Sequence, residues 1–215
     1  MKLPQARFIT SATKLENCPP SDGRPEFAVV GRSNVGKSSL INTLAHQKTL
    51  AKTSRTPGRT QLINFFDFGP FVLVDLPGYG YAKVSHTTQD YWRRELSRFL
   101  KNRPALMGVV HLMDARHPLQ ENDRQMREFL LEAEVPLLVV LTKVDDVKQG
   151  DLARAVKLVR EETDQDPIMF SSKTGRGRKE LLNTLVHGEP EEEELGSDDA
   201  DEMGVEEIED PAGEN

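Results

Sequence analysis

A phosphate-binding loop is indicated near the start of the chain by the segment Gly31-Arg32-Ser33-Asn34-Val35-Gly36-Lys37-Ser38. Glycines let backbone N–H groups curl around phosphate oxygens, the lysine adds a positive charge, and the serine hydroxyl can reach a magnesium ion. An apolar run at residues 27–30 precedes the loop, and Leu40, Ile41 and Leu44 follow it at helical spacing, which is the strand, loop and helix order that the motif requires. The pattern predicts that this loop, together with Ser39, binds a nucleoside triphosphate.

Three further polar segments follow predicted strands. Asp75-Leu76-Pro77-Gly78 comes after an apolar run, where the aspartate can hold magnesium through a water molecule and the glycine N–H can contact a γ-phosphate. In Thr142-Lys143-Val144-Asp145 the carboxylate can accept two hydrogen bonds from guanine N1 and N2, donors that adenine does not present in this pattern, and the lysine stem can cover the base. Ser171-Ser172-Lys173 can supply backbone donors to guanine O6. Together these segments predict GTP rather than ATP as the ligand.

Strand and helix patterns alternate along the chain. Apolar runs predict strands near residues 27–30, 61–68, 71–75, 106–113, 135–141 and 168–170. Helical periodicity predicts helices near residues 37–46, 88–101, 118–131, 151–162 and 179–186. This alternation predicts an α/β fold in which a six-stranded, mostly parallel sheet carries helices on both faces, with ligands at the carboxyl ends of the strands.

These motifs together resemble the EngB family of bacterial GTPases, also called YihA or YsxC, within the TrmE-Era-like, translation-factor-related GTPases. The resemblance covers most of residues 1–187 and is most specific in the strings TSRTPGRTQ at residues 53–61 and DLPGYGYA at residues 75–82. It implies a Ras-like fold, binding of GTP or GDP with Mg²⁺, slow GTP hydrolysis, and a role in assembly of the large ribosomal subunit. It also implies a link to normal cell division and septation.

The resemblance assigns the magnesium ligands and the phosphate clamp. Ser38 and Thr60 are expected to bind Mg²⁺ directly and Asp75 through water, while Lys37 is expected to hold the β- and γ-phosphates.

A mobile segment, switch I, is expected at residues 47–60, ordered only when the γ-phosphate is present. Gly58 and Arg59 in it are expected to join Thr60 at the nucleotide. The residues expected to carry hydrolysis are Lys37, Asn34, Thr60 and Gly78.

Two departures from the commonest GTPase pattern bear on the mechanism. Tyr79 follows the glycine of the D-x-x-G segment, where many GTPases carry a glutamine that orients the attacking water, so slow unaided hydrolysis is expected. Thr142 stands where asparagine is usual in N-K-x-D, and its hydroxyl can still hold the loop while guanine affinity is weakened.

Asn34 carries a further hypothesis. Related GTPases that have this asparagine and lack the catalytic glutamine use K⁺ in place of part of an arginine finger. The alternative is that Asn34 only braces the loop.

The net charge of -7 is unevenly distributed. Residues 188–215 hold 14 acidic and no basic residues, which leaves residues 1–187 with 28 basic and 21 acidic residues and a net charge of +7. Such a tail cannot bury enough apolar surface to fold, so it is expected to be disordered, serving solubility or competing with nucleic acid for the basic surface. Residues 1–24, which contain several prolines, are expected to form an N-terminal arm, and residues 25–187 the GTP-binding domain.

Cysteine and apolar content bear on localisation. Cys18 is the sole cysteine, and the sequence shows neither a signal segment nor a stretch of 18 apolar residues. These features predict a cytoplasmic protein without a membrane anchor, and a monomer is expected.

The basic body indicates a nucleic-acid partner. Basic side chains recur on helix 88–101, in switch I and near residue 178, as follows: Arg94, Arg98, Lys101, Lys48, Lys52, Arg55, Arg59, Arg176, Arg178 and Lys179. The GTP form is expected to dock on ribosomal RNA of the large subunit or its precursor, with no role for DNA. The alternatives are a division-associated switch with indirect ribosomal effects, an ATP-dependent kinase, and a non-enzymatic RNA-binding scaffold.

Overall fold

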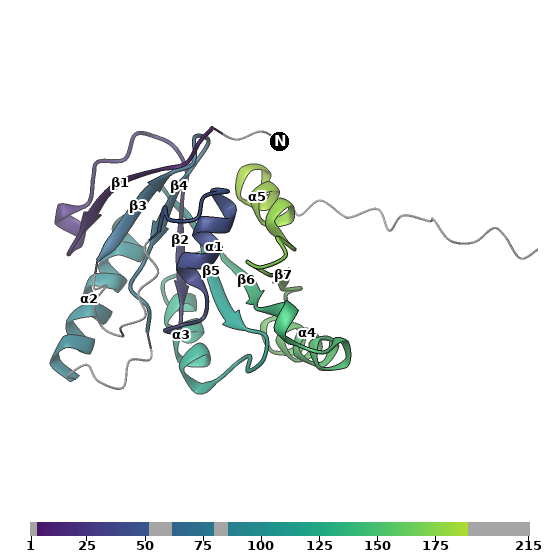
Figure 1. The fold of residues 1–215 in the computed structure, drawn as a ribbon. Coiled ribbons are helices and arrows are strands. Elements are labelled where there is room, and N and C mark those ends of the chain that lie inside the picture. The colour runs from purple at the N-terminus through teal and green to yellow at the C-terminus, as the bar shows by residue number, and fades with distance from the viewer. Residues whose placement is uncertain (1–3, 52–61, 80–85, 189–215) are drawn as a thin grey trace, which may run out of the picture.

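A seven-stranded sheet with helices on both faces forms the body of the protein (Figure 1). The computed structural model describes residues 4–51, 62–79 and 86–188, without the side chains of residues 86–90 and 92. The strands are β1 (Arg7–Ala12), β2 (Glu26–Gly31), β3 (Ile63–Asp67), β4 (Val72–Asp75), β5 (Leu106–Asp114), β6 (Leu137–Thr142) and β7 (Ile168–Phe170). The helices are α1 (Lys37–Leu44), α2 (His86–Asn102), α3 (Glu121–Leu131), α4 (Gln149–Thr163) and α5 (Arg178–His187), with short 3₁₀ helices η1 (Leu15–Asn17) and η2 (Val144–Asp146).

The sheet has the strand order β1-β3-β4-β2-β5-β6-β7. The five strands from β4 to β7 in that order run parallel, whereas β1 pairs antiparallel with β3, and β3 pairs antiparallel with β4. The mostly parallel α/β class predicted from the sequence is confirmed, but the predicted number of six strands is wrong by one.

The extra strand, β1, comes from the segment expected to be an arm. It pairs with β3 from Arg7 opposite Asp67 to Ala12 opposite Ile63, at the edge of the sheet. Most of its side chains are exposed, so the segment lacks the apolar run that marks the buried strands. Beyond it, the Leu15 N–H donates to Glu95 of α2 at 3.3 Å, and this bond attaches the N-terminal segment to the body.

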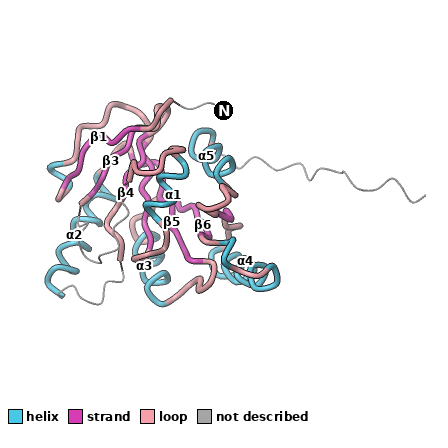
Figure 2. Tube along the Cα trace, viewed as in Figure 1, coloured by secondary structure: helices cyan, strands magenta, loops and turns pink. Residues whose placement is uncertain are grey.

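The helices divide between the two faces. Figures 1 and 2 show α1 and α5 together on one side of the sheet, and the apolar side chains of α2, α3 and α4 pack against the other face. Helix α3 begins at Glu121, three residues later than predicted, because Gln120 and Asp123 form a capping box there and Leu119 takes a positive φ of 53°. No helix in the described ranges is both long and apolar enough to cross a membrane.

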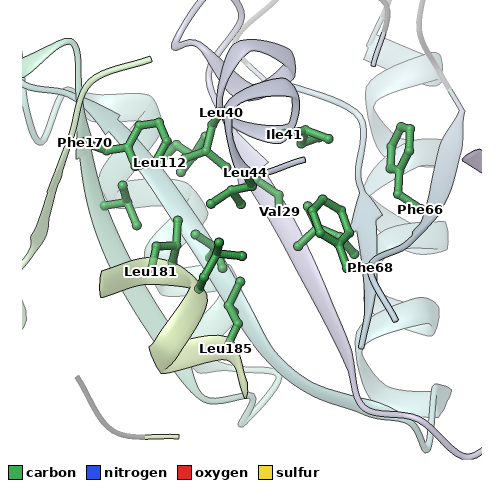
Figure 3. Close-up of a cluster of buried hydrophobic side chains, with 14 of the residues drawn as sticks. Val29, Leu40, Ile41, Leu44, Phe66, Phe68, Leu112, Phe170, Leu181 and Leu185 are labelled. Atoms are coloured by element: carbon green, nitrogen blue, oxygen red, sulfur yellow. The ribbon is translucent and has the colours of Figure 1, made fainter. Parts of the chain in front are cut away.

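The core beneath α1 supports the phosphate-binding loop. Leu40, Ile41 and Leu44 of α1 pack with Val29 of β2 and Leu181 of α5, all of them almost fully buried (Figure 3). Burial of aliphatic side chains stabilises by about 1.5–3 kcal/mol each. The helix that follows the loop is thereby fixed against the sheet.

Candidate nucleotide-binding site

The polar segments singled out in the sequence lie together at one edge of the sheet. β2 ends at Gly31, β4 at Asp75, β6 at Thr142 and β7 at Phe170, immediately before Ser171. Because these strands are parallel, their carboxyl ends meet at the same edge, which is where open α/β sheets bind ligands.

Two glycines shape the phosphate-binding loop. Gly36 has a φ of +109°, which favours glycine, and it caps α1. A Cβ on Gly31 would lie 2.7 Å from Cγ1 of Val35, so the loop closes tightly over the end of β2. The first N–H groups of α1, at Lys37, Ser38 and Ser39, lack partners within the helix and can bind phosphate.

Lys37 and Asp75 form an ion pair across the site. The Asp75 carboxylate also accepts a hydrogen bond of 3.3 Å from Nδ2 of Asn64 on β3. Asn64 accepts in turn from Ser11 of β1 at 2.7 Å, so the added edge strand is linked to the predicted magnesium side of the site. Asn64 was not singled out in the sequence, because only the β3–β4 pairing places it opposite Asp75.

The base-side segment is hydrogen-bonded to the phosphate-binding loop. The Thr142 hydroxyl lies 2.7 Å from the Val35 carbonyl oxygen and 3.2 Å from that of Met113. Lys143, with a φ of +59°, donates from Nζ to the Asn34 carbonyl oxygen at 2.6 Å. Threonine at this position therefore does hold the loop, which is the role that asparagine has in the commoner motif.

Asp114, at the end of β5, is a site residue that the motif search missed. Its Oδ2 accepts hydrogen bonds from Lys143 at 2.8 Å and from Arg116 at 2.7 Å. Burial acts to raise the pKa of the Asp114 carboxyl, but the bonds from Arg116 and Lys143 outweigh burial and hold that pKa well below its usual range. Asp114 is therefore ionised at neutral pH and fixes the Lys143 side chain over the loop.

The guanine-side carboxylate is oriented by the last strand. The Ser171 hydroxyl donates to Asp145 at 2.5 Å and accepts from the backbone N–H of Lys173 and Thr174 at 3.2 and 3.1 Å. Lys173 Nζ lies 3.9 Å from Asp145. Ser171 thus acts through its side chain, in addition to the backbone donors predicted for residues 171–173, of which Ser172 is exposed.

The predicted site residue Arg32 and the residue in place of the glutamine, Tyr79, both turn toward α3. Arg32 donates from Nε to Asp123 at 3.0 Å and from Nη2 to the His117 carbonyl oxygen at 3.1 Å. The Tyr79 hydroxyl lies 2.9 Å from Asp123 and 2.7 Å from Nε2 of His111. In this structure the Arg32 side chain braces the loop from outside, and the residue that replaces glutamine is engaged in a buried cluster.

The remaining predicted site residues lie in the phosphate loop, in the D-x-x-G segment or outside the described residues. Ser33 donates its N–H to the Tyr79 carbonyl oxygen at 3.0 Å, and Asn34 is exposed with a φ of +64°. Leu76 is buried, and Pro77 and Gly78 follow it toward the loop. Gly58, Arg59 and Thr60 lie outside the described residues.

Replacing Asp114 by asparagine is expected to lower guanine-nucleotide affinity by roughly 10-fold. The loss of one charge-assisted bond is worth about 1.5–3 kcal/mol, and Lys143 would no longer be held over the base site. Titration with a fluorescent GDP analogue measures the change. An unchanged affinity in a stably folded Asp114→Asn variant would show that Lys143 is positioned by its bond to Asn34 alone.

The fold and this site define a P-loop GTPase. Residues 26–143 match the family model described as a 50S ribosome-binding GTPase. The probable GTP-binding protein EngB of Pelotomaculum thermopropionicum is 48% identical over 190 residues, which cover 86% of this chain and 96% of the relative. The protein of the same name from Glaesserella parasuis is 50% identical over 158 residues, covering 73% and 75% of the two chains. The chain belongs to the EngB family of GTP-binding proteins, which confirms the resemblance drawn from its motifs.

Solved structures show the same fold. The crystal structure of a probable GTP-binding protein engB matches with a TM-score of 0.61 and 24% identity, over 76% of this chain and 100% of the other. Era in complex with MgGDPNP and nucleotides 1506–1542 of 16S ribosomal RNA matches with a TM-score of 0.63 and 22% identity, over 80% of this chain and 58% of Era. At these identities the likeness concerns the fold, and it confirms the Ras-like class.

Proposed function

We propose that this GTPase is a nucleotide-dependent switch in assembly of the large ribosomal subunit. The observation that carries the proposal is the match to a family described as 50S ribosome-binding GTPases, which spans the phosphate loop, the D-x-x-G segment and Lys143. Era, of like fold, is described in complex with ribosomal RNA, although from the small subunit. The GTP form binds the particle, and hydrolysis releases it.

Mg²⁺ fits the residues present. Ser38 at the start of α1 offers a hydroxyl as a direct ligand, and Asp75 at the end of β4 offers a carboxylate that would hold Mg²⁺ through water, beside the substrate phosphates. Mg²⁺ supplies charge neutralisation on the β- and γ-phosphates. Lys37 leaves Asp75 and binds the phosphates when nucleotide enters, so the ion pair seen here keeps both charges compensated beforehand.

Slow unaided hydrolysis is part of the proposal. The Tyr79 side chain is held by His111 and Asp123, so it does not replace the water-orienting glutamine. K⁺ near Asn34 supplies part of the missing charge, and the exposure of Asn34 leaves its amide accessible. Turnover is expected to be faster in KCl than in NaCl, and equal turnover in both salts, with and without large subunits, contradicts the K⁺ role.

The basic surface is smaller than the sequence predicted. Arg98 pairs with Glu16 at 2.9 Å and Glu95 at 3.0 Å, and Arg178 donates to the Thr43 and Leu44 carbonyl oxygens at 2.8 and 2.9 Å, so both have structural partners. The exposed basic residues that remain for RNA phosphates in the described ranges include Lys48, Arg94, Lys101 and Arg176. Lys52, Arg55 and Arg59 lie outside the described residues.

Binding to purified particles tests the proposal. The protein is expected to co-sediment with mature or precursor large subunits in the presence of a non-hydrolysable GTP analogue, and less with GDP. A chain ending at His187, where α5 ends, tests the acidic tail, which is expected to weaken binding to RNA if it competes for the basic surface. Co-sedimentation that ignores both nucleotide and salt would contradict the switch.

Cell division and localisation complete the proposal. The protein acts in the cytoplasm as a monomer, and septation depends on it through the supply of large subunits. The alternative is a division-associated switch whose ribosomal effects are indirect. Depletion of the protein separates the two. A deficit of large subunits that precedes the septation defect supports the role in subunit assembly, whereas a septation defect that comes first supports the division-associated switch.

A further inference from the structure

A buried polar cluster joins the residue that follows the D-x-x-G segment to α3. His111 of β5 and the Asp123 side chain are fully buried, and Tyr79 lies between them. The Tyr79 hydroxyl contacts both, at 2.7 Å from His111 Nε2 and 2.9 Å from Asp123 Oδ1. None of these three side chains is required by the phosphate, magnesium or guanine contacts described above.

The proton positions in this cluster follow from its contacts. Burial lowers the pKa of His111 to about 3, so its imidazole is neutral at physiological pH. Among the residues that the structure describes, His111 Nδ1 has no hydrogen-bond partner, which suits a ring that carries its proton on Nε2 and donates it to the Tyr79 oxygen. The Tyr79 hydroxyl then donates to Asp123, giving a directed chain from β5 through Tyr79 to α3.

Asp123 binds the phosphate loop at the same time. It accepts from Arg32 Nε at 3.0 Å and, through Oδ2, from the Gln120 backbone N–H at 3.1 Å. The Tyr79 backbone is also bonded to the loop, since its N–H donates to the Gly31 carbonyl oxygen at 3.3 Å. Side chain and backbone therefore both hold Tyr79 beside the loop.

Gly78, whose N–H is the proposed γ-phosphate donor, directly precedes this anchored residue. Displacement of Tyr79 would leave a buried carboxylate and a buried imidazole short of one partner each, which is costly in a dry site. The anchor therefore opposes movement of Gly78 away from the loop. A backbone N–H that is already in position contributes the full free energy of its contact to nucleotide binding, because no conformational entropy has to be lost to order it.

We propose that Tyr79 is a positioning residue, anchored by His111 and Asp123, that sets Gly78 beside the phosphate loop and so favours GTP over GDP. GDP has no γ-phosphate and gains nothing from this arrangement. The inference rests on the proposed switch function, in which Gly78 contacts the γ-phosphate.

The test compares two nucleotides in the full chain. Tyr79→Phe removes only the hydroxyl and leaves the bond between Arg32 and Asp123 intact. Its affinity for a non-hydrolysable GTP analogue is expected to fall about 10-fold, comparable to the free energy of ordering one residue, while GDP affinity changes by less than about 2-fold. Asp123→Asn is expected to shift the ratio in the same direction, and Glu121→Gln, an equal charge change at an exposed position on α3, is expected to leave it unchanged.

The outcomes separate this inference from the proposed function. Equal losses for both nucleotides, or an unchanged ratio, in folded Tyr79→Phe overturn the positioning role. Gly78→Ala tests the contact itself: if it also leaves the ratio unchanged, the γ-phosphate contact and the switch fail with it. If Gly78→Ala lowers the ratio and Tyr79→Phe does not, only the anchor is refuted. Thermal midpoints of each variant establish that it is folded.

Discussion

Asp145→Asn is expected to lower GTP affinity by at least about 100-fold and to give the protein measurable affinity for xanthosine nucleotides. The carboxylate accepts two hydrogen bonds from guanine, and each bond to a charged group is worth about 1.5–3 kcal/mol. An asparagine presents a donor where guanine also presents its exocyclic amine donor, so one contact becomes repulsive. Xanthine has a carbonyl oxygen in place of that amine and can accept from the new amide.

The neighbouring carboxylate provides the matched control for this exchange. Asp146 is exposed and follows Asp145 directly in η2, so Asp146→Asn makes the same change of charge at the same end of the sheet. Competition of GTP and XTP against a labelled nucleotide measures both variants. Retention of GTP affinity in Asp145→Asn, or an equal loss in Asp146→Asn, would place base recognition elsewhere.

Arg103→Ala is expected to lower the free energy of unfolding by about 3–5 kcal/mol, because it leaves the Glu26 carboxylate buried without its partner. The two side chains form a two-bond pair, with 2.8 Å from Nε and 2.7 Å from Nη2, and they are only 9% and 3% exposed. Arg103 also donates to the Pro19 carbonyl oxygen at 2.8 Å and lies over the Phe65 ring at 5.3 Å. One side chain thus connects the end of α2, the start of β2 and the segment before it.

Arg124→Ala, on α3, is the control for the unfolding measurement. Arg124 also forms a two-bond pair, with Glu162 at 2.7 and 2.9 Å, but these side chains are 43% and 32% exposed, and surface pairs contribute little to stability. Urea titration at neutral pH measures both variants. Similar small losses for the two would mean that water reaches Glu26 and solvates it when Arg103 is removed.

The sequence allowed the strand-end motifs to be predicted because each one is local. The loop at residues 31–38 and the segments beginning at Asp75 and Thr142 all follow apolar runs, and a parallel sheet necessarily collects such ends at one edge. The same reasoning failed for β1, whose exposed side chains give no periodic signal at the edge of a sheet.

Contacts between segments that are distant in the sequence could not be predicted from local sequence patterns. Tyr79 and Asp123 are 44 positions apart and come into contact only when α3 packs against the sheet. Asp114 is recognised as part of the site through its hydrogen bond from Lys143, which is visible only in the folded structure. A buried histidine within the apolar strand 106–114 was the one signal available, since an imidazole in such a position needs a polar partner. The capping box that starts α3 likewise depends on Asp123, which accepts hydrogen bonds from three donors at once.

The bonds from Thr142 and Lys143 to the phosphate loop have a consequence for engineering the protein. The Thr142 hydroxyl and the Lys143 ammonium donate to the Val35 and Asn34 carbonyl oxygens, so the segment that carries the base-reading Asp145 also shapes the loop that holds the phosphates. The two subsites are therefore not interchangeable modules. A graft of residues 142–145 from an asparagine-type relative would have to keep donors that reach the carbonyl oxygens of residues 34 and 35, and libraries that vary residues 142 and 143 freely would lose these bonds in most members.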